Sequence, residues 1–158
     1  MASSTLGHIS DLHFGLSQTH ERTAAALCDA LMAARVDHVV VSGDITHRGR
    51  ADALERFEGM FHPLLRTGRM TVIPGNHDRL GHDVRRRISG DARVWLRQTD
   101  GLCIVCVDST GPHNRGWLAS YGQVTLDEVA EIEAMLAQAP AGVLKVVTLH
   151  HHPLPLPE

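Results

Sequence analysis

Short apolar runs alternate along the chain with longer segments whose apolar residues recur every three or four positions. The short runs are typical of buried strands, and the longer spacing is typical of amphipathic helices. This pattern predicts strands at residues 6–10, 38–42, 70–73, 92–96, 102–107 and 143–149. It predicts helices at residues 21–34 and 51–65, and a third that begins at Thr125. Because strands and helices alternate from the start, we expect an α/β fold with parallel strands joined by right-handed crossovers.

The helical segments also carry signals for their packing and their ends. Thr125 and Glu128 match a capping box, so we expect the third helix to begin there. Pro63 is expected to disturb the last turn of the second helix, because proline has no N–H to donate. The first helix is expected to turn one apolar face towards the core, formed by Leu27, Leu31 and Ala34.

The composition narrows the class of protein. The 158 residues are enough for one domain with a buried core, and we expect residues 1–158 to form a single domain. A net charge of −3 and few aromatic residues argue against a nucleic-acid partner, and no apolar run is long enough to span a membrane. Three cysteines, an odd number, and the lack of a visible secretory signal predict a cytoplasmic location. The unusual feature is histidine, with 12 residues against a single lysine.

Polar side chains directly follow four of the predicted strands. These groups are Asp11-Leu12-His13, Gly43-Asp44, Gly75-Asn76-His77-Asp78 and His150-His151-His152. In an open parallel sheet, ligands bind in the crevice at the carboxyl ends of the strands. We therefore expect the four groups to contribute to one site.

The spacing and chemistry of these residues indicate a metal centre. Asp11 and His13 are two positions apart, so in an extended chain their side chains point the same way. Asp44 has two carboxylate oxygens and can bridge two cations. Gly43 and Gly75 leave room where a Cβ would obstruct the site. Mixed carboxylate, amide and imidazole donors favour Mn, Fe or Zn, and two such ions about 3.5–4 Å apart form a clamp for attack on phosphate esters.

The same groups resemble the signature of a known family. The ordered set D-x-H, G-D, G-N-H-D and a histidine after a late strand resembles calcineurin-like metallophosphoesterases. The segments SDLHFG, SGDITHRGR, VDST and HHHPLP look most similar to bacterial proteins resembling class III cyclic-nucleotide phosphodiesterases. The resemblance implies a sandwich of two mixed β-sheets flanked by helices. It also implies hydrolysis of a phosphodiester, either a cyclic nucleotide or another small organic phosphate ester.

The resemblance further implies which residues hold the metal ions. Asp11 and His13 would bind a first ion, and Asp44 would bridge this ion to a second. Asn76 and His150 would complete the binding of the second ion. The nucleophile would be a metal-bound hydroxide, because two cations lower the pKa of the water that they share.

Other site residues would act on the substrate rather than on the metal ions. By the resemblance, His77 would protonate the leaving oxygen or stabilise the transition state, and Asp78 would orient His77 through a hydrogen bond. His47 and Arg48 lie close to the bridging aspartate in sequence and are weaker candidates for contacting the substrate. His113 is a further candidate, for which a plain surface loop is the alternative.

Two features of the C-terminal region leave alternatives open. His151 is an alternative to His150 as the ligand, since both follow the last predicted strand. The family carries a later Gly-His-x-His element with one ligand for each ion, and no Gly-His pair follows His150 here. We therefore expect a fragment of a longer protein or, alternatively, a naturally short relative. A non-catalytic protein with a partial metal site is the alternative function, and exposed edge strands would favour self-association.

Overall fold

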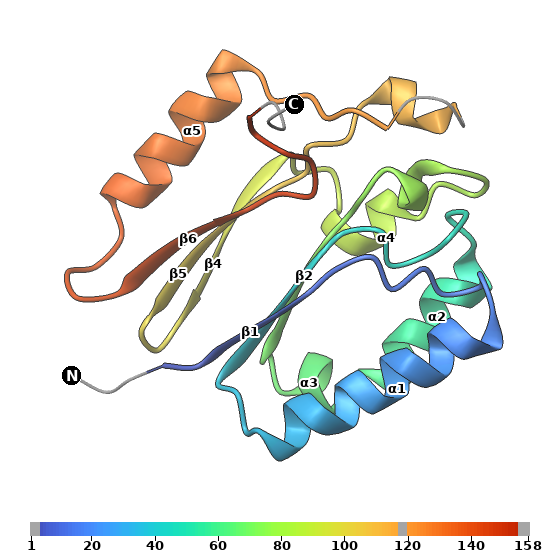
Figure 1. The fold of residues 1–158 in the computed structure, drawn as a ribbon. Coiled ribbons are helices and arrows are strands. Elements are labelled where there is room, and N and C mark those ends of the chain that lie inside the picture. Colours follow the sequence, from blue (N-terminus) through green and yellow to red (C-terminus); the bar gives the residue numbers. More distant parts are fainter. Residues whose placement is uncertain (1–3, 117–119, 155–158) are drawn as a thin grey trace.

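Two three-stranded sheets lie face to face between helices (Figure 1). The computed structural model describes residues 4–116 and 120–154. The first sheet is formed by β1 (Leu6–Ile9), β2 (His38–Ser42) and β3 (Met70–Ile73). The second is formed by β4 (Val94–Thr99), β5 (Leu102–Val107) and β6 (Leu144–Thr148).

Helices cover the outer side of each sheet. The longer helices are α1 (Gln18–Ala33), α2 (Ala51–Met60) and α5 (Leu126–Ala137). The shorter elements are α3 (His62–Arg66), α4 (Arg85–Ser89), and the 3₁₀ turns η1 (His77–Arg79) and η2 (Pro112–Arg115). Figure 1 shows α1, α2 and α3 beside the first sheet and α5 beyond the second. The α/β class, with two sheets flanked by helices, is confirmed.

Strand pairing brings the candidate residues to one edge of the first sheet. Its strands are all parallel, with Ile9 opposite Val41 and Ser42 opposite Ile73. In the second sheet, β4 pairs antiparallel with β5, and β5 pairs parallel with β6. Among the described strands, therefore, only the second sheet is mixed. The loops that follow β1, β2 and β3 leave the sheet at the same edge, as expected for parallel strands.

The core is divided into three layers by the two sheets. Between the first sheet and its helices lies a cluster that includes Phe14, Phe57 and Phe61. Between the sheets, Val40 of β2 and Ile104 of β5 belong to a second cluster. A third cluster joins alternate residues of β4 and β5 to the inner face of α5. In β2 and β5, alternate residues thus fill both faces of the sheet, which explains why these apolar runs in the sequence are continuous.

Two helices differ from the sequence prediction at their ends. The predicted helix at 51–65 is two helices, because α2 ends at Met60 and α3 begins at His62. Pro63 lies in the first turn of α3, where its missing N–H costs no hydrogen bond, so the chain breaks before the proline. Helix α1 begins at Gln18, three residues earlier than predicted, because the side chain of Ser17 caps it by accepting from the His20 amide. The predicted capping box of Thr125 and Glu128 is confirmed.

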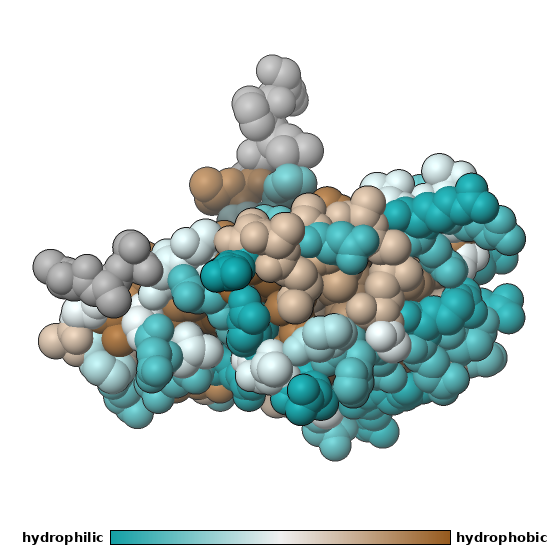
Figure 2. Space-filling view, turned by 90° about the horizontal axis from the view of Figure 1, so that it is seen from below, coloured by the Kyte–Doolittle hydropathy of each residue, from teal (hydrophilic) through white to brown (hydrophobic). Residues whose placement is uncertain are grey.

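The apolar face of α1 is rotated from the prediction. Its buried residues are Ala24 and Cys28, with Leu31 partly buried beside them, whereas Leu27 is 37% exposed. Ala34 caps the helix at the surface. Figure 2 shows a pale-brown area in an otherwise largely hydrophilic lower face. No helix in the described part of the chain, α1 included, is long and apolar enough to cross a membrane.

Candidate metal centre

The loops after β1 and β2 run side by side and are joined through their backbones. The amide of Asp11 donates to the Gly43 carbonyl (3.1 Å), and the amide of His13 donates to the Asp44 carbonyl (3.0 Å). Asp11, His13 and Asp44 all have a left-handed backbone, with φ of 58°, 47° and 51°. The expected extended geometry at Asp11 and His13 is therefore wrong, because β1 ends at Ile9 and the chain turns sharply after it.

This left-handed backbone is concentrated at the candidate site. Five non-glycine residues of the described chain have positive φ, and three of them are predicted metal ligands. Such a conformation costs about 1–3 kcal/mol for a side chain with a Cβ, less for aspartate, and persists where surrounding contacts enforce it. Here the two paired loops supply those contacts, and the three side chains turn towards a common point.

A third loop, after β3, is tied to the second by the buried side chain of Asp78. Its Oδ2 accepts from the amides of Ile45 (3.1 Å) and Gly75 (2.9 Å). Its Oδ1 accepts from the amide and the hydroxyl of Thr46, both at 2.8 Å. Burial, partly offset by the backbone donors of Gly75 and Thr46, raises the pKa of the Asp78 carboxyl to about 6.

The His77 ring is oriented by a backbone carbonyl. Its Nδ1 lies 2.7 Å from the carbonyl oxygen of His47. Because a carbonyl can only accept, Nδ1 carries the proton, and Nε2 faces Asp44, at 3.9 Å from Oδ2. The predicted hydrogen bond from Asp78 to His77 is thus wrong, since the His47 carbonyl occupies that place and Asp78 binds the loop backbones instead.

The first predicted set of ligands meets around the Nε2 of His13. This atom lies 3.8 Å from Asp11 Oδ1 and 3.9 Å from Asp44 Oδ2, too far for a direct hydrogen bond. Donor atoms of the three residues all lie within 4.8 Å of one another. Metal–ligand distances near 2.0–2.2 Å fit such a separation, because one ion can then touch all three atoms.

The second set meets around the Nε2 of His150. This atom lies 3.2 Å from Asn76 Oδ1 and 3.5 Å from Asp44 Oδ1. The Nδ1 of His150 lies 2.8 Å from the Ser42 carbonyl and donates to it. His151 points elsewhere, with its Nδ1 2.8 Å from the Ser109 hydroxyl. Of the two alternatives, the geometry therefore places His150 beside the other predicted ligands.

The donor set fits a pair of metal ions. When His150 donates through Nδ1, its Nε2 presents a lone pair to the Oδ1 atoms of Asn76 and Asp44. These three electron-rich atoms repel one another, and a cation between them would relieve the repulsion. A metal-binding histidine commonly donates its other N–H to a carbonyl in this way. Burial lowers the pKa of His13, which favours the neutral form of the ring that can coordinate a metal ion. Its buried Nδ1 has no hydrogen-bond partner among the described residues, and Nε2 is the atom aimed at the carboxylates.

The weaker sequence candidates divide between two places. The His47 ring stacks on His77, with centroids 5.4 Å apart, and lies 5.6 Å from the ring of His13. Burial, with the neighbouring His77 next in importance, lowers the pKa of His47. Arg48 is exposed beside it, and the two line a separate cavity of about 320 Å³. His113 instead stacks on Tyr121, a residue that the sequence analysis did not single out because an isolated loop tyrosine carries no motif.

Two glycines leave space for the site. A Cβ on Gly43 would lie 2.5 Å from His150 Nδ1, and φ at this residue is 95°. A Cβ on Gly75 would lie 2.2 Å from Asp44 Oδ1 and 2.3 Å from the Asp44 amide nitrogen. The two glycines therefore leave room for the side chains of His150 and Asp44, as predicted.

A Gly75→Ala substitution is expected to weaken metal binding by roughly 100-fold, because the new methyl group must push Asp44 about 1 Å from its place. Gly59→Ala is the matched control, since a Cβ there meets nothing within 4 Å and alanine favours the helix. Calorimetric Mn²⁺ titration of both variants is the measurement. Equal affinities in Gly75→Ala and wild type would show that Asp44 tolerates the displacement.

Comparison with known proteins identifies the family of this chain. The family model described as calcineurin-like phosphoesterase matches residues 4–157. The glycerophosphodiester phosphodiesterase GpdQ of Enterobacter lignolyticus is 32% identical over 96% of this chain and 58% of its own length. A probable cyclic nucleotide phosphodiesterase of Rhodococcus erythropolis is 28% identical over 77% of this chain and 40% of its own. The chain thus spans about half the length of these relatives.

A solved structure shares the fold. The crystal structure of a dimetal phosphatase from Danio rerio superimposes with a TM-score of 0.62 at 13% identity, covering 93% of this chain and 69% of the other. At that identity the likeness concerns the arrangement of helices and strands. The family match extends over nearly every residue, including the four loops that carry the predicted ligands. The chain belongs to the calcineurin-like phosphoesterase family.

Proposed function

We propose that this chain forms a metal-dependent phosphodiesterase that hydrolyses a small organic phosphodiester at a dinuclear centre. The first ion would be held by Asp11 and His13 and the second by Asn76 and His150, with Asp44 between them. The proposal also takes support from the two relatives, both named as phosphodiesterases.

The observation that carries the proposal is that the two oxygens of the Asp44 carboxylate face two different groups of predicted ligands. Its Oδ2 faces His13 Nε2 and its Oδ1 faces His150 Nε2, at 3.9 and 3.5 Å. The side chain is buried, and its Oδ1 is further fixed by the amide of His77 at 2.8 Å. A carboxylate that presents one oxygen to each of two ligand groups is arranged to bridge two ions.

The chemistry of the donors suits Mn, Fe or Zn ions. When bound, two such ions would polarise the phosphoryl group and lower the pKa of a water molecule held at the site. With both ring nitrogens protonated, His77 would supply the proton for the leaving oxygen from Nε2, because its Nδ1–H is committed to the His47 carbonyl. Asp78 keeps the loops in register through their backbone amides, and so maintains the distances between the ligands.

Metal titration tests the proposal directly. Protein stripped with a chelator is expected to bind two equivalents of Mn²⁺ by calorimetry. Hydrolysis of bis-p-nitrophenyl phosphate should appear with the metal and disappear again on adding EDTA. Failure to bind metal or to hydrolyse the diester would support the alternative of a non-catalytic protein that keeps the fold.

A further inference from the structure

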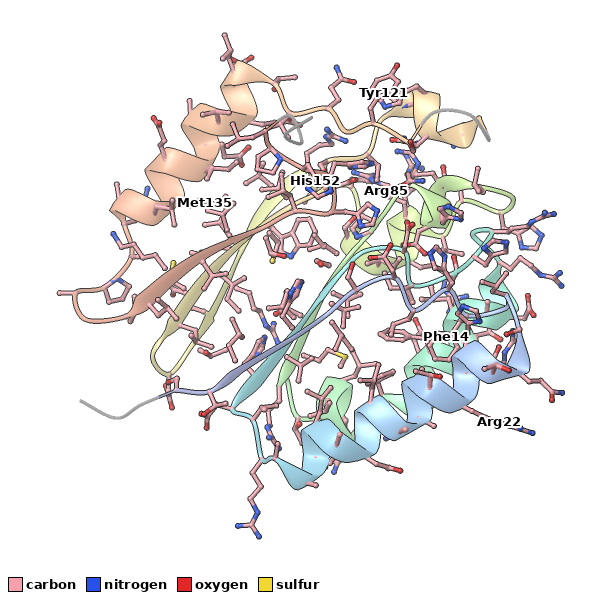
Figure 3. The ribbon with its side chains drawn as sticks, in the orientation of Figure 1. Phe14, Arg22, Arg85, Tyr121, Met135 and His152 are labelled. Atoms are coloured by element: carbon pink, nitrogen blue, oxygen red, sulfur yellow. The ribbon has the colours of Figure 1, made fainter. Side chains whose placement is uncertain are left out.

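Tyr121 lies exposed in the loop between η2 and α5, and its ring is stacked on His113. The side chain is among the most exposed large residues, with 65% of its surface open. The two ring centroids are 4.1 Å apart and the planes are within 7° of parallel. Figure 3 shows Tyr121 at the edge of the molecule, next to the ribbon of η2. One face of the phenol ring is therefore supported by an imidazole.

The loop is held by the backbone of Tyr121 rather than by its ring. The Tyr121 carbonyl accepts from His113 Nε2 (2.9 Å) and from the side-chain amide of the buried Asn114 (3.2 Å). The Asn114 Oδ1 in turn accepts from the amide of Gly111 (2.7 Å). Any residue at position 121 would supply the same carbonyl, so anchoring the loop does not explain an aromatic side chain there.

Tyr121 lines the same cavity as three of the candidate metal ligands. This cavity has a volume of about 440 Å³, within the range of small-molecule sites. The residues that line it include Asp11, Asn76 and His150 together with Tyr121. A diester whose phosphate lies at the ligands would therefore have one of its two substituents within the part of the cavity bounded by Tyr121.

We propose that Tyr121 is a substrate-binding residue that stacks against a planar aromatic substituent of the phosphodiester, a nucleobase or an aryl group. This inference rests on the proposed function. The Tyr121 ring, stacked on one face by His113, matches the π-face of a base. Such stacking does not depend on which base is present. A quaternary ammonium group would instead call for a cage of several rings. The platform thus selects aromatic over aliphatic diesters.

Kinetics on two classes of diester test this selection. In Tyr121→Leu, the ratio of kcat/KM for cyclic AMP to kcat/KM for glycerophosphoethanolamine is expected to fall about tenfold, mainly through a higher KM for cyclic AMP. Tyr121→Phe keeps the ring and should keep the ratio. Leu126→Ala is the control, because Leu126 is 87% exposed nearby and does not line the cavity. An unchanged ratio in Tyr121→Leu would overturn the inference.

Equilibrium binding separates this inference from the proposed function. AMP and glycerol phosphate share a phosphate, so the Mn²⁺-loaded protein should bind AMP more tightly, and Tyr121→Leu should reduce that preference about tenfold. If the wild type hydrolyses neither diester, the proposed function fails, but this binding arm still decides the role of Tyr121. Glycerophosphocholine, which carries a quaternary ammonium group, is the third ligand in this binding measurement. Equal binding of AMP and glycerol phosphate would overturn the aromatic platform. A larger loss of affinity in Tyr121→Leu for glycerophosphocholine than for AMP would overturn it too.

Discussion

Asp44→Asn is expected to remove phosphodiester hydrolysis almost completely and to lower the metal content from two equivalents to one or none. The substitution keeps the size of the side chain but removes the negative charge that faces both ligand groups. Losing several kcal/mol of charge stabilisation corresponds to a fall in kcat on the order of 1,000-fold. Metal analysis of the purified variant and its turnover of bis-p-nitrophenyl phosphate with Mn²⁺ are the measurements.

Asp91→Asn is the matched control for this experiment. The Asp91 side chain is 85% exposed and pairs with Arg86 at the surface, so the same chemical change should affect neither metal content nor turnover. In the Asp44→Asn variant itself the loop should stay folded, because asparagine tolerates the left-handed backbone of position 44. Two retained equivalents of metal in Asp44→Asn, with unchanged turnover, would exclude Asp44 as the bridge.

His77→Ala is expected to reduce turnover of an alkyl diester such as glycerophosphoethanolamine by about 100- to 10,000-fold, the range for loss of a general acid. Bis-p-nitrophenyl phosphate should lose much less, because p-nitrophenolate leaves readily without a proton. Metal content should stay at two equivalents, since the roles proposed here make His77 a proton donor and not a ligand.

The comparison of leaving groups is what distinguishes this role. Equal losses for both diesters would assign His77 to binding the phosphoryl group, and a loss of metal would make it a ligand. His82→Ala is a suitable control, because His82 is exposed on the loop that follows η1.

The strands that are buried on both faces could be predicted from the sequence with their bounds intact. This holds for β2, β3 and β5, whose side chains fill two layers of the core and therefore read as continuous apolar runs. The bounds of β4 were shifted, because its second half is polar and is held in the sheet by pairing with β5. Helix α4 was missed because it too is polar and is held by a partner outside the segment. Its Arg85 pairs with the buried Asp108, which follows β5.

The candidate ligands could be predicted because they follow strands whose order the sequence makes plain. What the sequence did not reveal are contacts made by the backbone. The pairing of the two ligand loops and the bond from His77 to the His47 carbonyl involve peptide groups that every residue carries. Tyr121 was not singled out because its place beside the predicted ligands depends on the path of a loop, which has no periodic pattern.

The left-handed backbone at Asp11, His13 and Asp44 implies a trade-off between stability and chemistry. Glycine would relieve the backbone cost at each of these positions, so selection for a stable fold alone would favour it there. The chain instead carries side chains that can hold a cation. The strain at these three positions is thus a cost to folding that the predicted site imposes, and a variant that loses the site by taking glycine there would be expected to keep its fold.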